Sequence, residues 1–192
     1  MDYSLWRSQL SERFCVIKEP EIEDIWELDE GISRINNFPL DASCKMNPRF
    51  PNNIQLADNL YGAVLPVISL KLKENLEREV AENRVEYLPV RIINHKGRVA
   101  SESYFILNPL DVYDCIDLDR SGVEWNKITS NLISYCKGLI LKEKSIPEGY
   151  KLFRPKYWRS NILVRRDLVE TLTKMGFTGL VFRETAGYKG IG

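Results

Sequence analysis

The spacing of hydrophobic residues predicts regular structure mainly in the second half of the chain. The segment VLPVISLKLKENLEREVAEN (64–83) begins as a short apolar strand, and Ser69 is a suitable N-cap for a following helix. Leu72, Leu76 and Val80 recur every four residues among lysines and glutamates. This pattern is typical of an amphipathic helix of about three turns.

Two alternating segments after this helix predict a β-hairpin. VEYLPVRII (85–93) and SYFILNPL (103–110) are rich in β-branched and aromatic residues, and NHKG (94–97) between them has the composition of a turn. VYDCIDLD (112–119) then predicts a further strand or a bent extension of the hairpin.

The C-terminal part repeats the order strand, helix, strand. Ile162–Val164 predicts a strand, and Leu168 and Leu172 lie on one face of the helix that follows. Gly176 ends this helix, and Thr178–Glu184 predicts another strand. Aligning VISLKLKENL with LVRRDLVETL reproduces the earlier pattern at an offset of 96 residues. This repeat of strand, helix and strand arises either from a duplication within the chain or, as we favour, because such a unit is a common way of covering a sheet with a helix.

The N-terminal part shows little periodicity. NNFPLDASCKMNPRFPNN (36–53) contains three prolines and five asparagines, which predicts an extended, turn-rich path. We expect one domain over residues 1–192, with an irregular segment (1–55) packed on a core (56–187). The fold class is α+β, a mostly antiparallel sheet with a few amphipathic helices on one face.

Length and composition restrict the class of protein. With 192 residues, 44% of them hydrophobic, the chain is long enough for one buried core and unlike a disordered chain. No apolar stretch approaches the ~18 residues of a membrane span, and the acidic N-terminus does not resemble a secretion signal. We therefore expect a cytoplasmic protein. Its four scattered cysteines are expected to be free, buried thiols.

The charge is unevenly distributed although the net charge is zero. Residues 1–30 carry nine acids and three bases, whereas residues 137–192 carry twelve bases and five acids. Either the two ends neutralise each other within the fold, which we favour, or one of them presents a charged face to a partner.

The stretch YFILNPLDVYDCID (104–117) holds a conspicuous group of acids. Asp111, Asp114 and Asp117 are three residues apart without an intervening glycine, a spacing that excludes an EF-hand loop. On a strand, Asp114 and Asp117 would face opposite sides, so the carboxylates would not converge on a metal or form an acid–base pair. We expect both to be structural anchors, Asp114 as a buried carboxylate with a polar or cationic partner.

Motifs typical of enzymes are missing from the sequence. It has no glycine-rich nucleotide loop and no nucleophile elbow. The single histidine, His95, lies in the predicted turn, away from any cysteine that could share a zinc ion. We expect no catalytic residues, no metal and no cofactor. A hydrolase that assembles distant carboxylates is the enzymatic alternative.

Two segments are candidates for binding a partner. RPKYWRSN (154–161) places aromatic residues among bases, as in proteins that stack on single-stranded nucleic acid. The zero net charge disfavours nucleic acid, and the same composition suits a protein interface. The second candidate is the acidic segment Glu19–Glu30, which has seven acids and no base. The candidate partner-binding residues are Glu21, Glu23, Asp24, Trp26, Glu27, Tyr157, Trp158 and Arg159.

Several stretches, taken in order, resemble one protein family. SLKLKENLE, VEYLPVRI, YFILNPLDVYDCIDLDRS, LFRPKYWRSNILVRRDLVETL and GFTGLVFRE are similar to the bacterial polymorphic-toxin immunity family whose founding member is myxobacterial. Its signature is a strand of the form lLNvl..vdciD followed by an lfR segment. The resemblance spans residues 56–185 and departs from the family pattern at Pro109.

The resemblance implies a protein that neutralises a cognate toxin by direct, non-catalytic binding. A basic toxin, such as a nuclease, would suit the acidic segment, because opposite charges speed association. An adaptor without a toxin partner is the other non-enzymatic alternative. The oligomeric state and the identity of the toxin stay open.

Overall fold

Strands from both ends of the chain meet in one sheet of the computed structural model, which describes residues 2–81 and 84–191. The N-terminal strand β1 lies between β12 and β11 and is antiparallel to both. The strand order is β12-β1-β11-β10-β7. The strands are β1 (Tyr3–Ser8), β7 (Val112–Tyr113), β10 (Leu152–Pro155), β11 (Leu163–Arg165) and β12 (Leu180–Glu184).

β1 is the main departure from the irregular structure expected before residue 56. Leu5 belongs to one buried cluster and Trp6 to another, because both faces of this central strand are covered. A strand buried on both faces lacks the alternation of apolar and polar residues that identifies a half-exposed strand. The N-terminal strand therefore could not be recognised from its pattern.

The second sheet is built on the predicted hairpin. Its order is β2-β5-β6-β4-β3, and only the β2–β5 pair is parallel within it. The predicted mostly antiparallel α+β class is confirmed. The strands are β2 (Ser43–Lys45), β3 (Asn59–Leu60), β4 (Val67–Ser69), β5 (Val85–Ile93) and β6 (Val99–Pro109).

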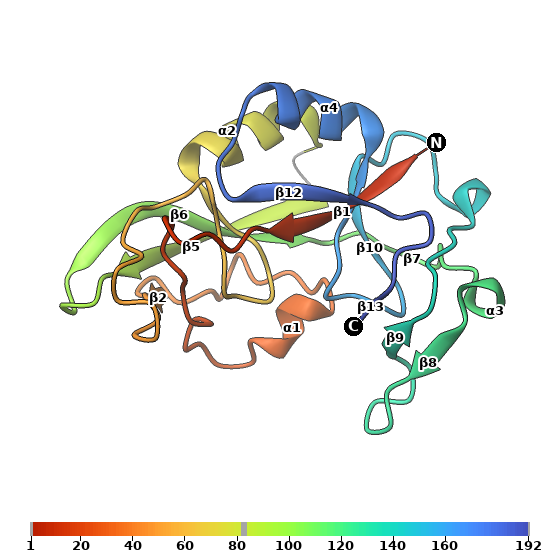
Figure 1. The fold of residues 1–192 in the computed structure, drawn as a ribbon, viewed down its shortest axis with the longest axis horizontal. Helices are drawn as coiled ribbons and strands as arrows, with labels where there is room; N and C mark the ends of the chain where they lie inside the picture. Colours follow the sequence, from red (N-terminus) through yellow and green to blue (C-terminus); the bar gives the residue numbers. More distant parts are fainter. Residues whose placement is uncertain (1, 82–83, 192) are drawn as a thin grey trace.

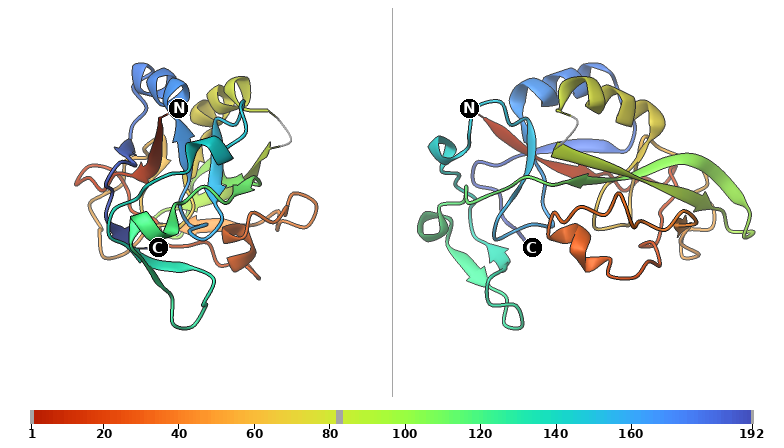
Figure 2. Two further views of the ribbon diagram at one scale, coloured as in Figure 1. Left: turned by 90° about the vertical axis from the view of Figure 1, so that its right-hand side faces the viewer. Right: turned by 180° about the vertical axis from the view of Figure 1, so that it is seen from behind.

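Two amphipathic helices cover the same side of these sheets (Figure 1). They are α2 (Leu70–Glu79) and α4 (Arg166–Lys174), and Figure 2 shows them side by side from two further directions. The predicted N-cap of α2 is confirmed, since the Ser69 hydroxyl accepts a hydrogen bond from the Leu72 backbone N–H at 3.3 Å. The apolar faces of both helices contribute to one buried cluster that joins the two sheets.

The two helices belong to units of the same topology. In β4-α2-β5 and β11-α4-β12, the two strands flank a third strand that is antiparallel to both, β6 in the first unit and β1 in the second. The offset of 96 residues seen in the sequence therefore relates whole units of the fold, from β4 and β11 onwards.

Buried polar contacts around Asn59 join the two sheets. Its side-chain amide accepts from Trp6 Nε1 at 3.2 Å and donates to the Gly179 carbonyl at 2.9 Å. Gly179 has a φ of +73°, and a Cβ there would lie 2.1 Å from the Asn59 carbonyl oxygen. Only glycine fits this close approach between the edge of one sheet and the start of β12.

The remaining elements are short. A third sheet, in the order β13-β9-β8, extends from the lower right of the molecule in Figure 1. All four cysteines are free and buried, as predicted, and burial raises the pKa of Cys115 to about 12. The short elements are α1 (Trp26–Asp29), α3 (Leu118–Ser121), β8 (Val123–Trp125), β9 (Ile133–Cys136), the 3-10 helix η2 (Glu143–Ser145) and β13 (Gly190–Ile191).

Candidate partner-binding surface

Arg34 organises the acidic segment around α1. Its guanidinium is largely buried and donates to the Glu27 carboxylate at 2.5 Å and to the carbonyls of Glu23 and Asp24 at 3.4 Å. The backbone N–H of Arg34 in turn donates to a carboxylate oxygen of Glu86 on β5 at 2.9 Å. The segment is therefore fixed to the second sheet by buried polar contacts, and Glu27 has a structural partner.

Three other acids of this segment face solvent around an exposed tryptophan. Glu21, Glu23 and Asp24 are exposed, and the side chain of Trp26 is 59% exposed. Glu21 contacts the exposed Lys45 at 3.2 Å, an ion pair of little energetic value at the surface. We name Glu21, Glu23, Asp24 and Trp26 the α1 surface.

A small apolar cavity lies beside Trp26. It has a volume of about 160 Å³, and its lining includes Trp26, Val64, which is 56% exposed, and the buried Leu28. Glu19 and Asp29 complete its rim, and burial raises the pKa of each carboxyl above its ordinary value. An exposed aromatic side chain beside an apolar cavity, with charged residues around it, is typical of an interface hot spot.

The basic candidate segment, in contrast, is mostly packed inside the protein. Trp158 is 2% exposed and belongs to the cluster under the first sheet, so its prediction as a partner-binding residue is wrong. Tyr157 is half-buried and its ring contacts that of Trp125 edge-on, with centroids 5.6 Å apart. Arg159 forms an ion pair with Glu30, which directly follows α1. The acidic and basic segments thus contact each other, as expected if the charged ends partly neutralise one another.

A buried polar network lies between these two segments, and sequence analysis missed it. Arg154 is fully buried, and its guanidinium donates to the Pro109 carbonyl at 2.9 Å, the Arg159 carbonyl at 2.5 Å and Asn108 Oδ1 at 3.3 Å. The Asn108 amide donates to Glu86 at 3.1 Å, which connects the network to Arg34. Burial lowers the pKa of Arg154 to about 10, and the nearby Asp29 carboxylate opposes that effect.

The network gives a structural reason for the family-like motifs. Asn108 is the asparagine of YFILNPL and Arg154 is the arginine of LFRP, and they lie 46 residues apart in the chain. An asparagine next to a proline inside an apolar run was the only signal, because a polar residue there needs a buried partner.

Asp114 and Asp117 do not take the places expected of them on a continuous strand. Asp114 is exposed and pairs with Lys142 at 2.8 Å, so the prediction of a buried anchor is wrong. The reason is that β7 ends at Tyr113 and the chain turns there, with the Cys115 backbone N–H donating to the Tyr113 carbonyl at 3.0 Å. Asp117 instead precedes α3, where its carboxylate accepts from the Arg120 backbone N–H at 3.1 Å as an N-cap.

Neither a cluster of metal ligands nor the single histidine adds a candidate site in the described part of the chain. Within residues 2–81 and 84–191, no group of three or more histidine, cysteine or acidic side chains could hold a metal ion. His95 is exposed in the turn between β5 and β6. No helix in these ranges has the length and apolar composition needed to cross a membrane.

Comparison with known families identifies the chain. The model of the immunity protein family Imm11 matches residues 14–187, so the chain belongs to this family. The match confirms the resemblance noted in the sequence and extends it into the N-terminal segment, including the acidic region around α1. A search of curated proteins found no match.

Proposed function

We propose that this member of the immunity protein family protects the cell that makes it by binding a cognate toxin directly and without catalysis. The observation that carries the proposal is the family match over residues 14–187. The site geometry supports it, because Asp114 pairs with Lys142 and Asp117 caps α3. These two acids thus have structural partners, which weakens the alternative of a hydrolase built on them. We place this action in the cytoplasm.

The α1 surface is the docking face that we propose for the toxin. Its three exposed carboxylates suit a basic face, such as that of a nuclease, and would accelerate capture by electrostatic steering. Trp26 and the cavity beside it offer an apolar centre within the charged rim. Aromatic residues in such a setting contribute a large share of binding energy in protein complexes.

Growth rescue tests the proposal. A candidate cognate toxin domain is expressed under an inducible promoter in a bacterium that lacks its own immunity protein, with or without this chain. Rescue by the wild-type chain is the expected result. Death of the cells despite normal levels of folded protein would overturn the proposed function.

Matched tryptophan variants test the docking face. Trp26→Ala should weaken binding of the purified toxin domain at least about tenfold, which corresponds to about 1.4 kcal/mol. Trp125→Ala removes a tryptophan that is 41% exposed on β8, outside the α1 surface, and should leave binding within about threefold of wild type. Equal losses in both variants would contradict a specific role for α1.

A further inference from the structure

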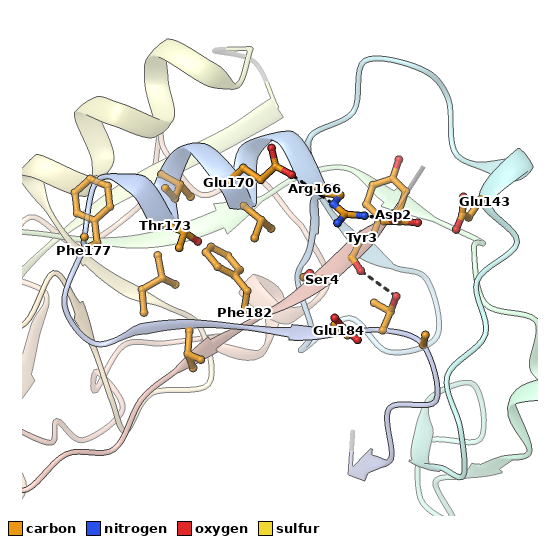
Figure 3. A pocket seen from close by; sticks show the side chains of 17 residues that line it. Asp2, Tyr3, Ser4, Glu143, Arg166, Glu170, Thr173, Phe177, Phe182 and Glu184 are labelled. Atoms are coloured by element: carbon orange, nitrogen blue, oxygen red, sulfur yellow. Dashed lines mark hydrogen bonds and ion pairs between the residues drawn. The ribbon is translucent and has the colours of Figure 1, made fainter.

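A second recess lies between α4 and β12 (Figure 3). α1 lies on the other side of the molecule from these two elements (Figure 1). Its volume is about 770 Å³. Leu180 and Phe182 line it from β12, and Thr173 and Phe177 line it from α4 and the turn that follows. The Phe182 ring packs edge-on against Trp6 with centroids 5.7 Å apart, which fixes the β12 side of the groove.

The backbone of β12 is unpaired on the side away from β1. β12 is the last strand of its sheet, and the pairs Leu5–Arg183 and Arg7–Val181 set its register with β1. Trp6 donates its backbone N–H to Ile162 on the opposite side, towards β11. In an antiparallel pair, hydrogen-bonded residues alternate with residues whose N–H and C=O point outward.

It follows that residues 180, 182 and 184 direct their backbone groups outward from the sheet. In the described part of the chain, no neighbouring element makes a backbone hydrogen bond to these outward-facing groups. A free strand edge is a template for an added strand. A strand added to this edge would lie along the groove and could direct alternate side chains towards α4.

The groove carries an excess of acids at one end. Asp2, Glu143, Glu170 and Glu184 line it together with one base, Arg166, so its lining contains three more carboxylates than cations. Arg166 contacts both Asp2 at 2.6 Å and Glu170 at 3.4 Å. The charge favours a basic occupant. A second copy of this chain would bring its own acids to the same place, and the carboxylates would repel nucleic acid.

We propose that this groove binds an extended, basic segment of the toxin, which adds as a strand to the free edge of β12. Apolar side chains at alternate positions of the segment enter the space between Phe182 and α4, and a lysine or arginine reaches the acidic end. The identity of the partner rests on the proposed function. Because α1 lies across the molecule from the groove, a toxin that docks on α1 reaches the groove through an extended segment.

Blocking the groove is the first test of this inference. Thr173 is exposed and lines the groove, so Thr173→Trp should weaken binding of the purified toxin domain at least tenfold. Thr171 lies two residues earlier on α4 and does not line the groove, which makes Thr171→Trp the matched control. The control should bind within threefold of wild type, and both variants should keep the wild-type melting temperature within a few degrees.

Removing one outward N–H is the second test. Glu184→Pro and Glu184→Ala both remove the carboxylate, but only proline also removes the outward N–H, while the pairing with β1 is kept. Proline should weaken binding at least fivefold more than alanine does. Equal binding by these two variants would contradict strand addition.

The outcomes separate this inference from the proposed function. A toxin domain that binds wild type and also binds Thr173→Trp and Glu184→Pro with unchanged affinity would overturn the groove and leave toxin neutralisation standing. A toxin domain that fails to bind wild type would overturn both.

Discussion

Replacing Arg154 with methionine tests the buried network that connects the family-like motifs. Methionine fills much of the same volume but donates no hydrogen bonds. The change leaves the Pro109 and Arg159 carbonyls and the Asn108 side-chain oxygen without their shared donor. All three acceptors lose a bond to a charged group in a site from which water is excluded, since Arg154 is fully buried.

The size of the effect follows from these contacts. The bonds to the Pro109 and Arg159 carbonyls are no longer than an ordinary hydrogen bond, and a hydrogen bond to a charged group contributes about 1.5–3 kcal/mol. Burying the guanidinium is itself costly, and methionine relieves that cost, so the net loss is smaller than the sum. We expect the free energy of unfolding to fall by about 4 kcal/mol. For a chain of this size this corresponds to a melting temperature lower by about 8–16 °C.

Thermal unfolding followed by circular dichroism measures the effect. Arg98→Met is the matched control, because Arg98 is exposed in the turn between β5 and β6. The control should change the melting temperature by less than about 2 °C, as is usual for a surface substitution. If Arg154→Met melts within about 4 °C of wild type, the network does not stabilise the fold as argued.

Three further predictions concern stability. Asn59→Leu leaves Trp6 Nε1 without its acceptor and removes one of the two donors of the Gly179 carbonyl, which keeps the Gln9 backbone N–H. It should lower the free energy of unfolding in urea by about 2–4 kcal/mol, whereas Asn75→Ala, which removes only an exposed hydrogen bond to the Lys71 carbonyl on α2, should change it by less than about 0.5 kcal/mol. Burial alone would raise the pKa of Asp58, but hydrogen bonds from Thr178 and Ser69 outweigh burial and hold the folded pKa below its ordinary value. The stabilisation is therefore complete above the unfolded pKa of about 4 and is lost as the pH falls towards the folded pKa; Asp58→Asn should lose less stability than wild type between pH 6 and pH 3. Asp114→Ala should cost less than about 1 kcal/mol in the same urea assay, because its ion pair with Lys142 is exposed, and a larger loss would restore the anchor role first expected of it.

The parts of the fold that the sequence predicted are those with local causes. The β5–β6 hairpin follows from two alternating segments and a turn, and α2 follows from Ser69 and the spacing of Leu72 and Leu76. β1 could not be predicted, because its partners lie more than 150 residues away and both of its faces are buried. Its six residues carry no period that distinguishes a central strand from an irregular segment.

The candidate site was predictable only in part, for a similar reason. The acids and Trp26 of the α1 surface stand out in the sequence. Burying an unpaired carboxylate is costly, so surface positions for these acids could be expected, whereas the exposure of Trp26 could not. Trp158 was misplaced because an aromatic among bases suits both an interface and a packed loop, and only the tertiary fold decides between them. The pairing of Asn108 with Arg154 depends on two distant strands meeting, and no local pattern contains that information.

Titration of toxin activity against this protein tests the central claim most directly. Purified wild-type protein is added in increasing amounts to a fixed amount of the cognate toxin domain, and the toxin's activity on its own substrate is measured after each addition. Neutralisation by stoichiometric binding predicts that activity falls in proportion and reaches its minimum near one equivalent. Inactivation of the toxin by a small fraction of an equivalent would reveal catalysis, and activity unchanged at several equivalents would exclude neutralisation; either result would contradict the account.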